Sequence, residues 1–128
     1  MRMEELNDIS YLIRGGIFEV HKVLGPGLLE SIYVQALVKE LNDSGLDVVT
    51  EKAIPVYYKG EKLALGFRLD ILVEDRIIVE VKSVERLMDV HKKQTLTYLK
   101  LTGKRLGILV NFNDTHIKDK ESLIRIIN

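Results

Sequence analysis

The sequence predicts a mixed α/β domain, in which helices come first, a meander of strands follows, and a further helix and strand come last. Three observations predict this order. Apolar residues recur at helical steps of three and four over 4–41. They then alternate with polar residues over 63–73 and 77–82, which is the period of a strand. Helical spacing returns over 88–102, before a mostly apolar run at 105–112.

Length and composition limit the possible classes of protein. A chain of 128 residues with 46% apolar content is predicted to form one domain, 1–128. Nineteen basic and nineteen acidic residues cancel, so a contact with nucleic acid needs a local basic patch. The absence of cysteine excludes disulfides and thiolate metal sites. We found no signal-peptide core and no apolar run of membrane-spanning length, and we therefore expect a cytoplasmic protein.

The first helix is predicted over 4–24, because its apolar residues share one side. They are Leu6, Ile9, Ile13, Ile17, Val20 and Leu24. Glycine and proline at 25–27 end this helix, and a second helical pattern runs from Leu29 to the stop signal Asn-Asp-Ser-Gly at 42–45.

The strands are predicted where polar and apolar residues alternate between turn signals. They cover 47–58, 63–73 and 77–83, with turns at 59–62 and 74–76. Pro55 indicates that the first strand lies at an edge or is irregular there. A helix over 88–102 should end at Gly103, and strands at 105–112 and 123–127 complete a mixed sheet.

One hairpin carries charge among apolar neighbours. Its odd positions are apolar, whereas its even positions include Arg68 and Asp70 on one strand and Glu80 and Lys82 on the next. If both apolar faces point to one core, the three-residue turn at 74–76 sets Asp70 opposite Glu80. Carboxylates on directly opposed residues repel unless a cation or a proton lies between them. The pattern therefore predicts a metal-binding pair, although a solvated outer face would give the same spacing.

The helix after this hairpin carries polar residues in the middle of a stripe. The stripe consists of Leu87, His91, Gln94, Tyr98 and Leu101. Either Gln94 and Tyr98 lie beside the carboxylates, or they are solvated while Leu96 and Leu99 face the core. Five basic residues on or just after the helix form the densest basic region near the predicted site: Lys92, Lys93, Lys100, Lys104 and Arg105.

These motifs, taken in order, resemble a known family. Asp70, then Glu-Val-Lys at 80–82, then Gln94-x-x-x-Tyr98 is similar to the PD-(D/E)XK nuclease superfamily with its QxxxY-type helix. The segment 27–33, Gly-x-x-Glu-x-x-Tyr, resembles the name-giving motif of its GxxExxY branch. The resemblance covers nearly the whole chain and implies a restriction-endonuclease-like fold.

The resemblance also implies a metal centre. Asp70, Glu80 and the main-chain carbonyl of Val81 would bind Mg²⁺ or Mn²⁺, for which hard oxygen ligands are suited. Lys82 would orient or help to deprotonate the attacking water, and would offset charge on the phosphate.

Further residues receive roles from the same resemblance. Gln94 and Tyr98 would position phosphate oxygens or water, and Glu30 would supply an extra acidic group. Glu30 has an alternative role at a helix start, where a carboxylate interacts favourably with the helix dipole. Arg68 is either a phosphate contact or the salt-bridge partner of Asp70. Tyr33 is expected in the core.

The function implied is metal-dependent hydrolysis of phosphodiesters in nucleic acid, with DNA as the expected substrate. The alternative is a non-catalytic module on the same fold that binds nucleic acid or a protein partner. Because the chain has room for little beyond the core, specificity should come from a homodimer, a partner or the substrate's shape. No chemistry is assigned to His21 or to the tail 113–128.

Overall fold

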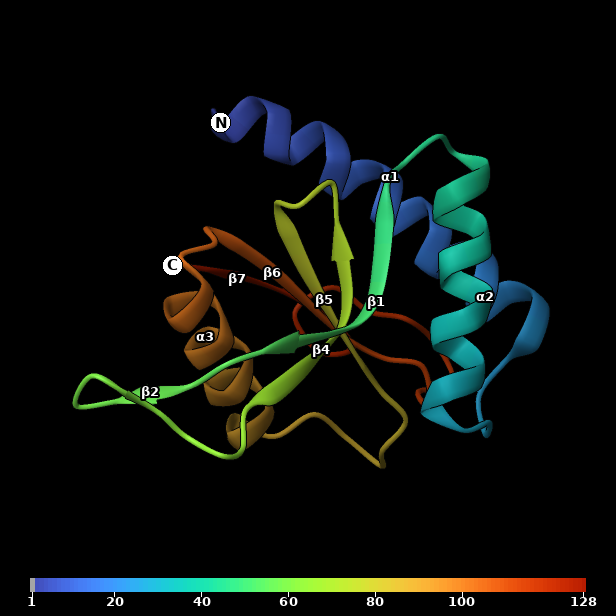
Figure 1. Ribbon diagram of the computed structural model, residues 1–128. Helices are drawn as coiled ribbons and strands as arrows, with labels where there is room; N and C mark the ends of the chain where they lie inside the picture. Colours follow the sequence, from blue (N-terminus) through green and yellow to red (C-terminus); the bar gives the residue numbers. More distant parts are fainter. Residues whose placement is uncertain (1) are drawn as a thin grey trace.

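The computed structural model describes residues 2–128, and its helices and strands follow the predicted order (Figure 1). They are α1 (Met3–Leu24), α2 (Glu30–Asp43), β1 (Val48–Ile54), β2 (Tyr57–Tyr58), β3 (Glu61–Lys62), β4 (Phe67–Val73), β5 (Ile77–Lys82), α3 (Asp89–Thr102), β6 (Leu106–Asn111) and β7 (Leu123–Ile127). The mixed α/β fold is therefore confirmed, including its last strand. Among these residues, no helix combines the length and apolar character needed to cross a membrane.

The main sheet has five strands in the order β1-β4-β5-β6-β7. β5 and β6 run parallel and are joined through α3, whereas the other neighbouring strands are antiparallel. The turn at 74–76 pairs Val73 with Ile77, as predicted from the apolar residues at the odd positions of the hairpin. This arrangement brings the carboxyl ends of β5 and β6 to one edge of the sheet.

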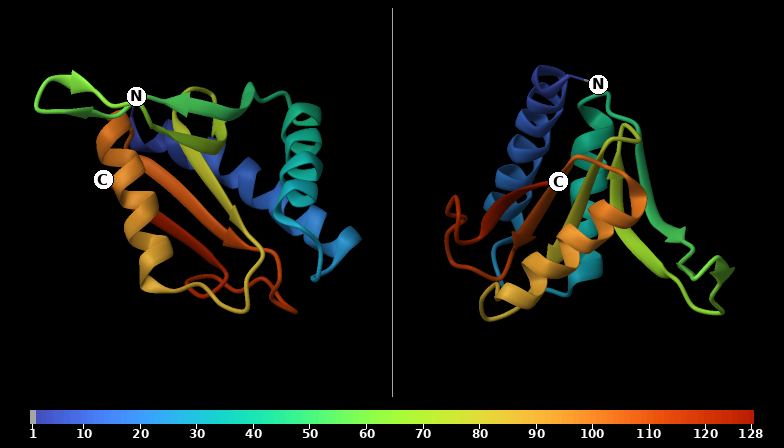
Figure 2. Two further views of the ribbon diagram at one scale, coloured as in Figure 1. Left: turned by 60° about the horizontal axis from the view of Figure 1, so that its bottom comes forward. Right: turned by 90° about the vertical axis from the view of Figure 1, so that its left-hand side faces the viewer.

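The predicted strands 47–58 and 63–73 were too long. β1 ends at Ile54, directly before Pro55, which has no N–H to donate to a ladder. A separate ribbon of β2 and β3 then projects from the body (Figure 2). β4 begins only at Phe67, and the preceding Leu65 is 82% exposed. Gly66 allows the chain to pass Ile54 closely, because a Cβ there would lie 2.2 Å from the Ile54 carbonyl oxygen.

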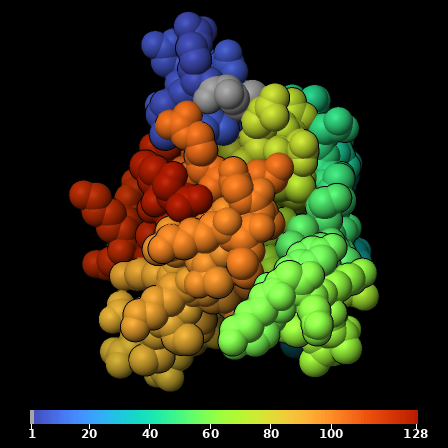
Figure 3. Space-filling view, turned by 60° about the vertical axis from the view of Figure 1, so that its left-hand side comes forward, coloured from blue at the N-terminus to red at the C-terminus, as the bar shows by residue number. Residues whose placement is uncertain are grey.

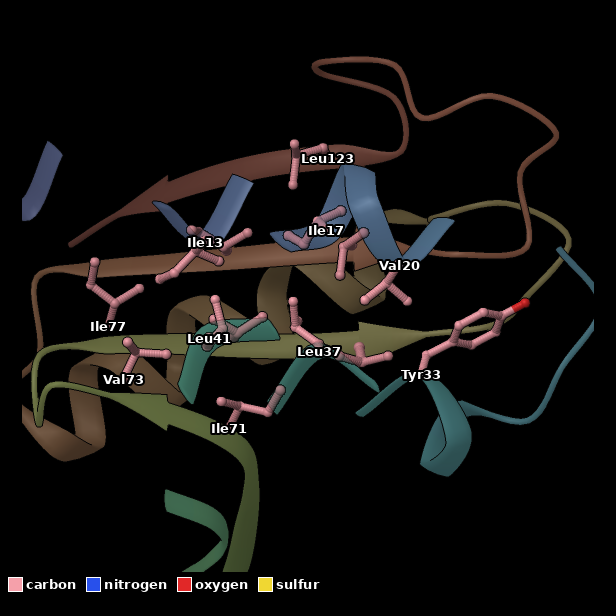
Figure 4. Packing of buried hydrophobic residues seen from close by; sticks show 14 of the residues in the cluster. Ile13, Ile17, Val20, Tyr33, Leu37, Leu41, Ile71, Val73, Ile77 and Leu123 are labelled. Carbon is pink, nitrogen blue, oxygen red and sulfur yellow. The ribbon is translucent and has the colours of Figure 1, made fainter. Parts of the chain in front are cut away.

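The sheet is covered on both faces. α1 and α2 pack on one face, where they form the larger apolar cluster (Figure 4). Gly16 allows the two helices to approach, since a Cβ there would lie 3.2 Å from side-chain carbons of Leu37 and Leu41. α3 covers the opposite face, and it lies beside the β2–β3 ribbon on the surface shown in Figure 3.

The expectation of one buried and one charged face was wrong. Ile78 and Glu80 belong to the second face, yet both are buried, because α3 lies over that face. Glu80 is only 3% exposed, which rules out a solvated surface role for it.

The helix α3 presents a different stripe to the sheet from the one predicted. Thr95 and Leu99 are its buried residues and lie against Gly107 of β6. Leu101, at the end of the predicted stripe, is 53% exposed. The helix ends as expected at Gly103, which is left-handed.

Candidate active site

The sheet opens locally at Asp70. The ladder between β4 and β5 ends at the pair Ile71–Val79. The ladder between β4 and β1 omits the position opposite Asp70, where Glu51 has a φ of 49°. Asp70 therefore lies at an interruption of both neighbouring ladders.

Two carboxylates occupy this opening. The Asp70 amide donates to Glu80 Oε2 at 3.0 Å, and the Val81 amide donates to Asp70 Oδ2 at 2.9 Å. The predicted pair is thus juxtaposed, but not as opposed residues of a regular ladder, because each carboxylate takes an amide of the facing strand. The opening also breaks the alternation of faces, since Leu69 packs with the α3 cluster while Ile71 packs with α1 and α2.

Burial and mutual repulsion make the charged forms of this pair unfavourable. Burial, followed by the charge of Asp70, raises the pKa of Glu80 from 4.5 to about 7. Burial also raises the pKa of Asp70, although the Val81 amide and the charge of Lys82 oppose the shift. A bound cation would relieve the same repulsion and favour both carboxylates in their charged form.

The oxygen atoms present fit a divalent metal ion. Asp70 Oδ1 and Glu80 Oε1 accept no hydrogen bond within residues 2–128. Both reach solvent, since no buried side-chain oxygen in that range lacks a partner. The Lys82 carbonyl accepts from the amide of Phe112, directly after β6, so the peptide groups of the preceding Val81 point the other way, toward β4. Two carboxylate oxygens and a carbonyl form a hard donor set of the type that Mg²⁺ binds together with water.

Protein side chains alone would not fill all the coordination positions of a Mg²⁺ ion at this site. Within residues 2–128, no group of three or more histidine or acidic side chains is placed to hold a metal ion. Mg²⁺ usually keeps several waters and takes only one or two carboxylates from the protein. Two carboxylates are therefore compatible with Mg²⁺, and water would occupy its remaining positions.

The helix α3 contributes two further predicted residues, Gln94 beside Lys82 and Tyr98 within the field of the carboxylates. Lys82 Nζ donates to Gln94 Oε1 at 3.3 Å. The ring of Tyr98 stacks on Phe67, with centroids 4.2 Å apart. Burial raises the pKa of Tyr98, and the charges of Glu80 and Asp70 add to the shift. The hydroxyl of Tyr98 therefore lies within the field of the carboxylates and stays protonated at neutral pH.

Glu30 reaches the site from the start of α2. Its Oε2 accepts from the Ser83 amide at 3.1 Å, while Ser83 Oγ donates to the Leu28 carbonyl at 2.7 Å. The charge of Glu30 also contributes to the raised pKa of both Asp70 and Glu80. Ser83 was not foreseen from the sequence, where its signal is a hydroxyl residue directly after the strand.

Tyr33 explains the spacing of the segment 27–33. The side chain is fully buried, as expected, and lies at the end of the apolar cluster in Figure 4. Its ring stacks on that of Phe112, with centroids 4.6 Å apart. Its hydroxyl donates to the Gly25 carbonyl at 2.6 Å and accepts from the Leu28 amide at 3.1 Å. Tyr33 thus holds the loop that delivers Glu30 to Ser83.

Replacing Tyr33 with Phe should lower the free energy of unfolding by about 1–2 kcal/mol, because two main-chain groups lose their partner while the ring stacking remains. Thermal or urea unfolding would measure the loss. The matched control is Tyr11→Phe, since Tyr11 is 76% exposed and should change stability by less than about 0.5 kcal/mol. Equal stabilities for the two variants would contradict the role assigned to the Tyr33 hydroxyl.

Arg68 lies on β4 but not in the carboxylate site. It is exposed and lines a depression together with Pro55 and Lys62. Within residues 2–128 it forms no ion pair with Asp70, so the salt-bridge alternative is not supported. Its contact with phosphate stays a prediction.

Asn111 at the end of β6 and His21 at the end of α1 fix the loops around the site. Asn111 is fully buried, and its side-chain amide pairs with both the amide and the carbonyl of Val84 at 3.0 and 2.9 Å. His21 Nε2 lies 2.7 Å from the Asp114 carbonyl, which ties the end of α1 to the loop after β6. Neither role is apparent from periodicity, because each depends on one side chain meeting a distant loop.

Two depressions of opposite charge lie on the surface around the site. A groove of about 920 Å³ between α2 and the sheet contains more acidic than basic side chains, namely Glu30, Asp43, Glu51 and Asp70 against Lys39. A depression of about 510 Å³ beyond the ends of β5 and β6 is mainly basic. Its charged lining residues are Arg86, Lys92, Lys118 and Lys120, with Asp114 and Glu121. The overall neutrality of the chain therefore conceals a local basic surface.

The family of the chain follows from comparison with known proteins. The model of the PD-(D/E)XK nuclease superfamily matches residues 7–126, a range that includes the carboxylate pair, Lys82 and the α3 residues of the site. No curated protein and no solved structure matches the chain significantly. The match spans nearly the whole sequence, and the chain therefore belongs to the PD-(D/E)XK nuclease superfamily.

Proposed function

We propose that residues 1–128 act as one nuclease domain, of the GxxExxY branch, that hydrolyses phosphodiester bonds of DNA with a divalent metal ion. The observation that carries the proposal is the pair Asp70–Glu80, in which Glu80 is buried and Asp70 half-buried. The two carboxylates repel each other and are held in place by main-chain amides. Membership of the superfamily supports nuclease activity. The position of Lys82 beside the pair supports hydrolysis over simple binding.

Asp70, Glu80 and the Val81 carbonyl would hold Mg²⁺ or Mn²⁺. The ion, when bound, supplies charge that lowers the pKa of water and offsets the charge of the phosphate. The protein contributes fixed ligands, because the two amide hydrogen bonds keep the carboxylates in place before any ion arrives.

Lys82 and the α3 residues act on water and phosphate. Gln94 accepts a hydrogen bond from the Lys82 ammonium group, which leaves further N–H donors to orient a water or a phosphate oxygen. The Tyr98 hydroxyl, protonated at neutral pH, donates to a phosphate oxygen. Such donors act where charge develops in the transition state. Glu30 supports the site by binding the Ser83 amide at the end of β5.

The charges around the site favour one path for the substrate. The basic depression near Lys118 attracts a phosphate backbone, whereas the acidic groove near Glu51 repels it. We therefore place the backbone along the segment 84–92 and the loop after β6.

Charge reversal tests this path. Lys118→Glu should weaken DNA binding several-fold in EDTA, and should lower the slope of log affinity against log salt by about one, since one phosphate contact is lost. Fluorescence anisotropy over a range of salt concentrations measures both. The matched control is Lys39→Glu, which reverses one charge in the acidic groove and should change the slope little. Equal effects of the two substitutions would contradict the proposed path.

The activity itself is tested with labelled duplex DNA, single-stranded DNA and RNA, each incubated with Mg²⁺, Mn²⁺ or EDTA. The expected result is cleavage of DNA with either metal and none in EDTA. Binding without cleavage under every condition would instead favour the non-catalytic alternative. Cleavage that persists in EDTA would contradict a metal-dependent mechanism.

A further inference from the structure

The outer face of α1 carries an ordered stripe of exposed residues. Its residues recur at steps of three, four, three and four: Asp8, Tyr11, Gly15, Phe18 and Lys22. All five are exposed. They lie on the side of the helix opposite its buried residues, and α1 itself lies on the face of the sheet opposite α3 (Figure 2).

No packing contact within residues 2–128 requires a glycine at position 15. A Cβ at Gly15 would meet no atom within 4 Å, in contrast to Gly16, which packs against α2. A glycine in the middle of a helix costs about 0.5–1 kcal/mol relative to alanine. Around Gly15 lies a hollow of about 340 Å³, whose other lining residues are Tyr11, Leu12, Arg14 and Phe18. Such a hollow allows the main chain of a second helix to come close to α1 at Gly15.

The stripe is complementary to itself when two copies run antiparallel. Asp8 and Lys22 each lie seven residues from Gly15, on opposite sides. About a two-fold axis through Gly15, Asp8 of one copy therefore meets Lys22 of the other, at both ends of the interface. Within residues 2–128, neither side chain forms an ion pair or a hydrogen bond. A parallel arrangement would instead place like charges together.

The apolar residues between these ends agree with the same arrangement. Tyr11 and Phe18 lie four and three residues from Gly15, so antiparallel copies bring the Tyr11 of one near the Phe18 of the other. Alternating steps of three and four are the spacing by which two helices pack along a seam. Tyr11 is 76% exposed in the single chain and would become covered.

We propose that this stripe is a homodimer interface, in which two α1 helices pack antiparallel and cross at Gly15. The inference goes beyond the proposed nuclease function and does not depend on it. A single pair of helices gives an interface at the small end of the specific range, so we expect a dissociation constant of about micromolar order.

Charge exchange is the first test. Sedimentation equilibrium of the full chain, over about 1–100 µM, should show a monomer–dimer equilibrium. Asp8→Lys alone and Lys22→Asp alone should each weaken the dimer about tenfold or more, because like charges then meet at both ends. The double exchange should restore it. A wild-type chain that stays monomeric throughout, or a dimer that both single exchanges leave unchanged, would overturn the proposal.

Disulfide trapping is the second test, and the absence of natural cysteine makes it clean. Within one helix, positions 8 and 22 lie about 21 Å apart, too far for a disulfide. The double variant Asp8→Cys, Lys22→Cys should therefore form a covalent dimer on mild oxidation, whereas each single variant should not. Efficient trapping of either single variant would indicate parallel helices and contradict the proposal.

Two substitutions at Gly15 distinguish an effect on dimer formation from an effect on folding. Gly15→Ala should raise the unfolding temperature of the monomer, because alanine favours the helix. Gly15→Leu should also preserve the fold, but it should weaken the dimer by filling the hollow at the crossing point. Undiminished association of the leucine variant would exclude a crossing at Gly15.

Discussion

Replacing Asp70 with Asn should lower the rate of metal-dependent DNA cleavage by about 10³-fold, measured as initial rates on labelled DNA. The Asn side-chain oxygen can still accept from the Val81 amide, so the open hairpin is kept while one negative metal ligand is lost. A metal ion contributes several kcal/mol to such a reaction, and each 1.4 kcal/mol corresponds to a factor of ten. Glu80→Gln should act similarly, since glutamine can accept from the Asp70 amide.

Lys82→Met tests the ammonium group separately from the metal. Methionine keeps much of the side-chain length but removes the charge and the hydrogen bond to Gln94. We expect a loss of about 10²-fold or more with Mn²⁺ binding retained, because the proposed ligands are unchanged. Calorimetric titration with Mn²⁺ measures the binding.

The chain offers a matched control for the acidic variants. The Glu74 carboxylate also accepts a main-chain amide, that of Asp47 at 2.7 Å, but it lies in the turn at the far end of the hairpin. Glu74→Gln should therefore leave the cleavage rate unchanged. If Asp70→Asn and Glu80→Gln kept rates close to that of Glu74→Gln, the carboxylate pair would not be the catalytic centre.

The sequence correctly predicted the features that depend on the spacing of apolar and polar residues close together in the chain. The three helices and the turn at 74–76 depend on residues close in the chain, and the observed boundaries differ little from the predicted ones. The opening of the sheet at Asp70 was not predictable in this way. It depends on carboxylates that replace ladder hydrogen bonds between strands, and a pattern of apolar and polar residues does not report such bonds.

The covered second face could have been foreseen. Leu72 and Ile78 are apolar at even positions of the hairpin, which is typical of strands buried on both faces. The charged residues at the other even positions favoured an exposed face instead. Glu80 is buried on the face that α3 covers, and the charges of both carboxylates contribute to the raised pKa of Tyr98 on that helix.

The assembly of the candidate site was predicted in part. The sequence predicted that the site residues on β4, β5 and α3 lie close together, because elements that follow one another in the chain are usually neighbours in space. These residues are Asp70, Glu80, Lys82, Gln94 and Tyr98. The contact between Glu30 and Ser83 was not predicted, since it joins residues 53 positions apart through a loop held by Tyr33. A single hydroxyl residue gives no periodic signal for such a contact.

In the absence of divalent metal, the free energy of unfolding should fall as the pH rises from about 4.5 to about 7. Glu80 has a pKa of about 7 in the folded protein, against 4.5 ordinarily. The folded state therefore holds a proton over this interval that the unfolded state has released. The stabilisation from protonated Glu80 is complete below pH 4.5 and is lost as the pH passes through 7. Its size is about 3 kcal/mol. The raised pKa of Asp70 acts in the same direction.

Comparison with Glu80→Gln isolates this effect from other titrating groups. Glutamine cannot lose a proton, so in EDTA the free energy of unfolding of the wild type should fall below that of the variant as the pH rises. Urea unfolding at each pH measures this difference. Mn²⁺ should reverse the loss in the wild type, by about 2.7 kcal/mol at one hundred times its dissociation constant, and more effectively above pH 7. Parallel pH curves for the two proteins, or equal stabilisation of both by Mn²⁺, would show that Glu80 neither holds the proton nor binds the ion.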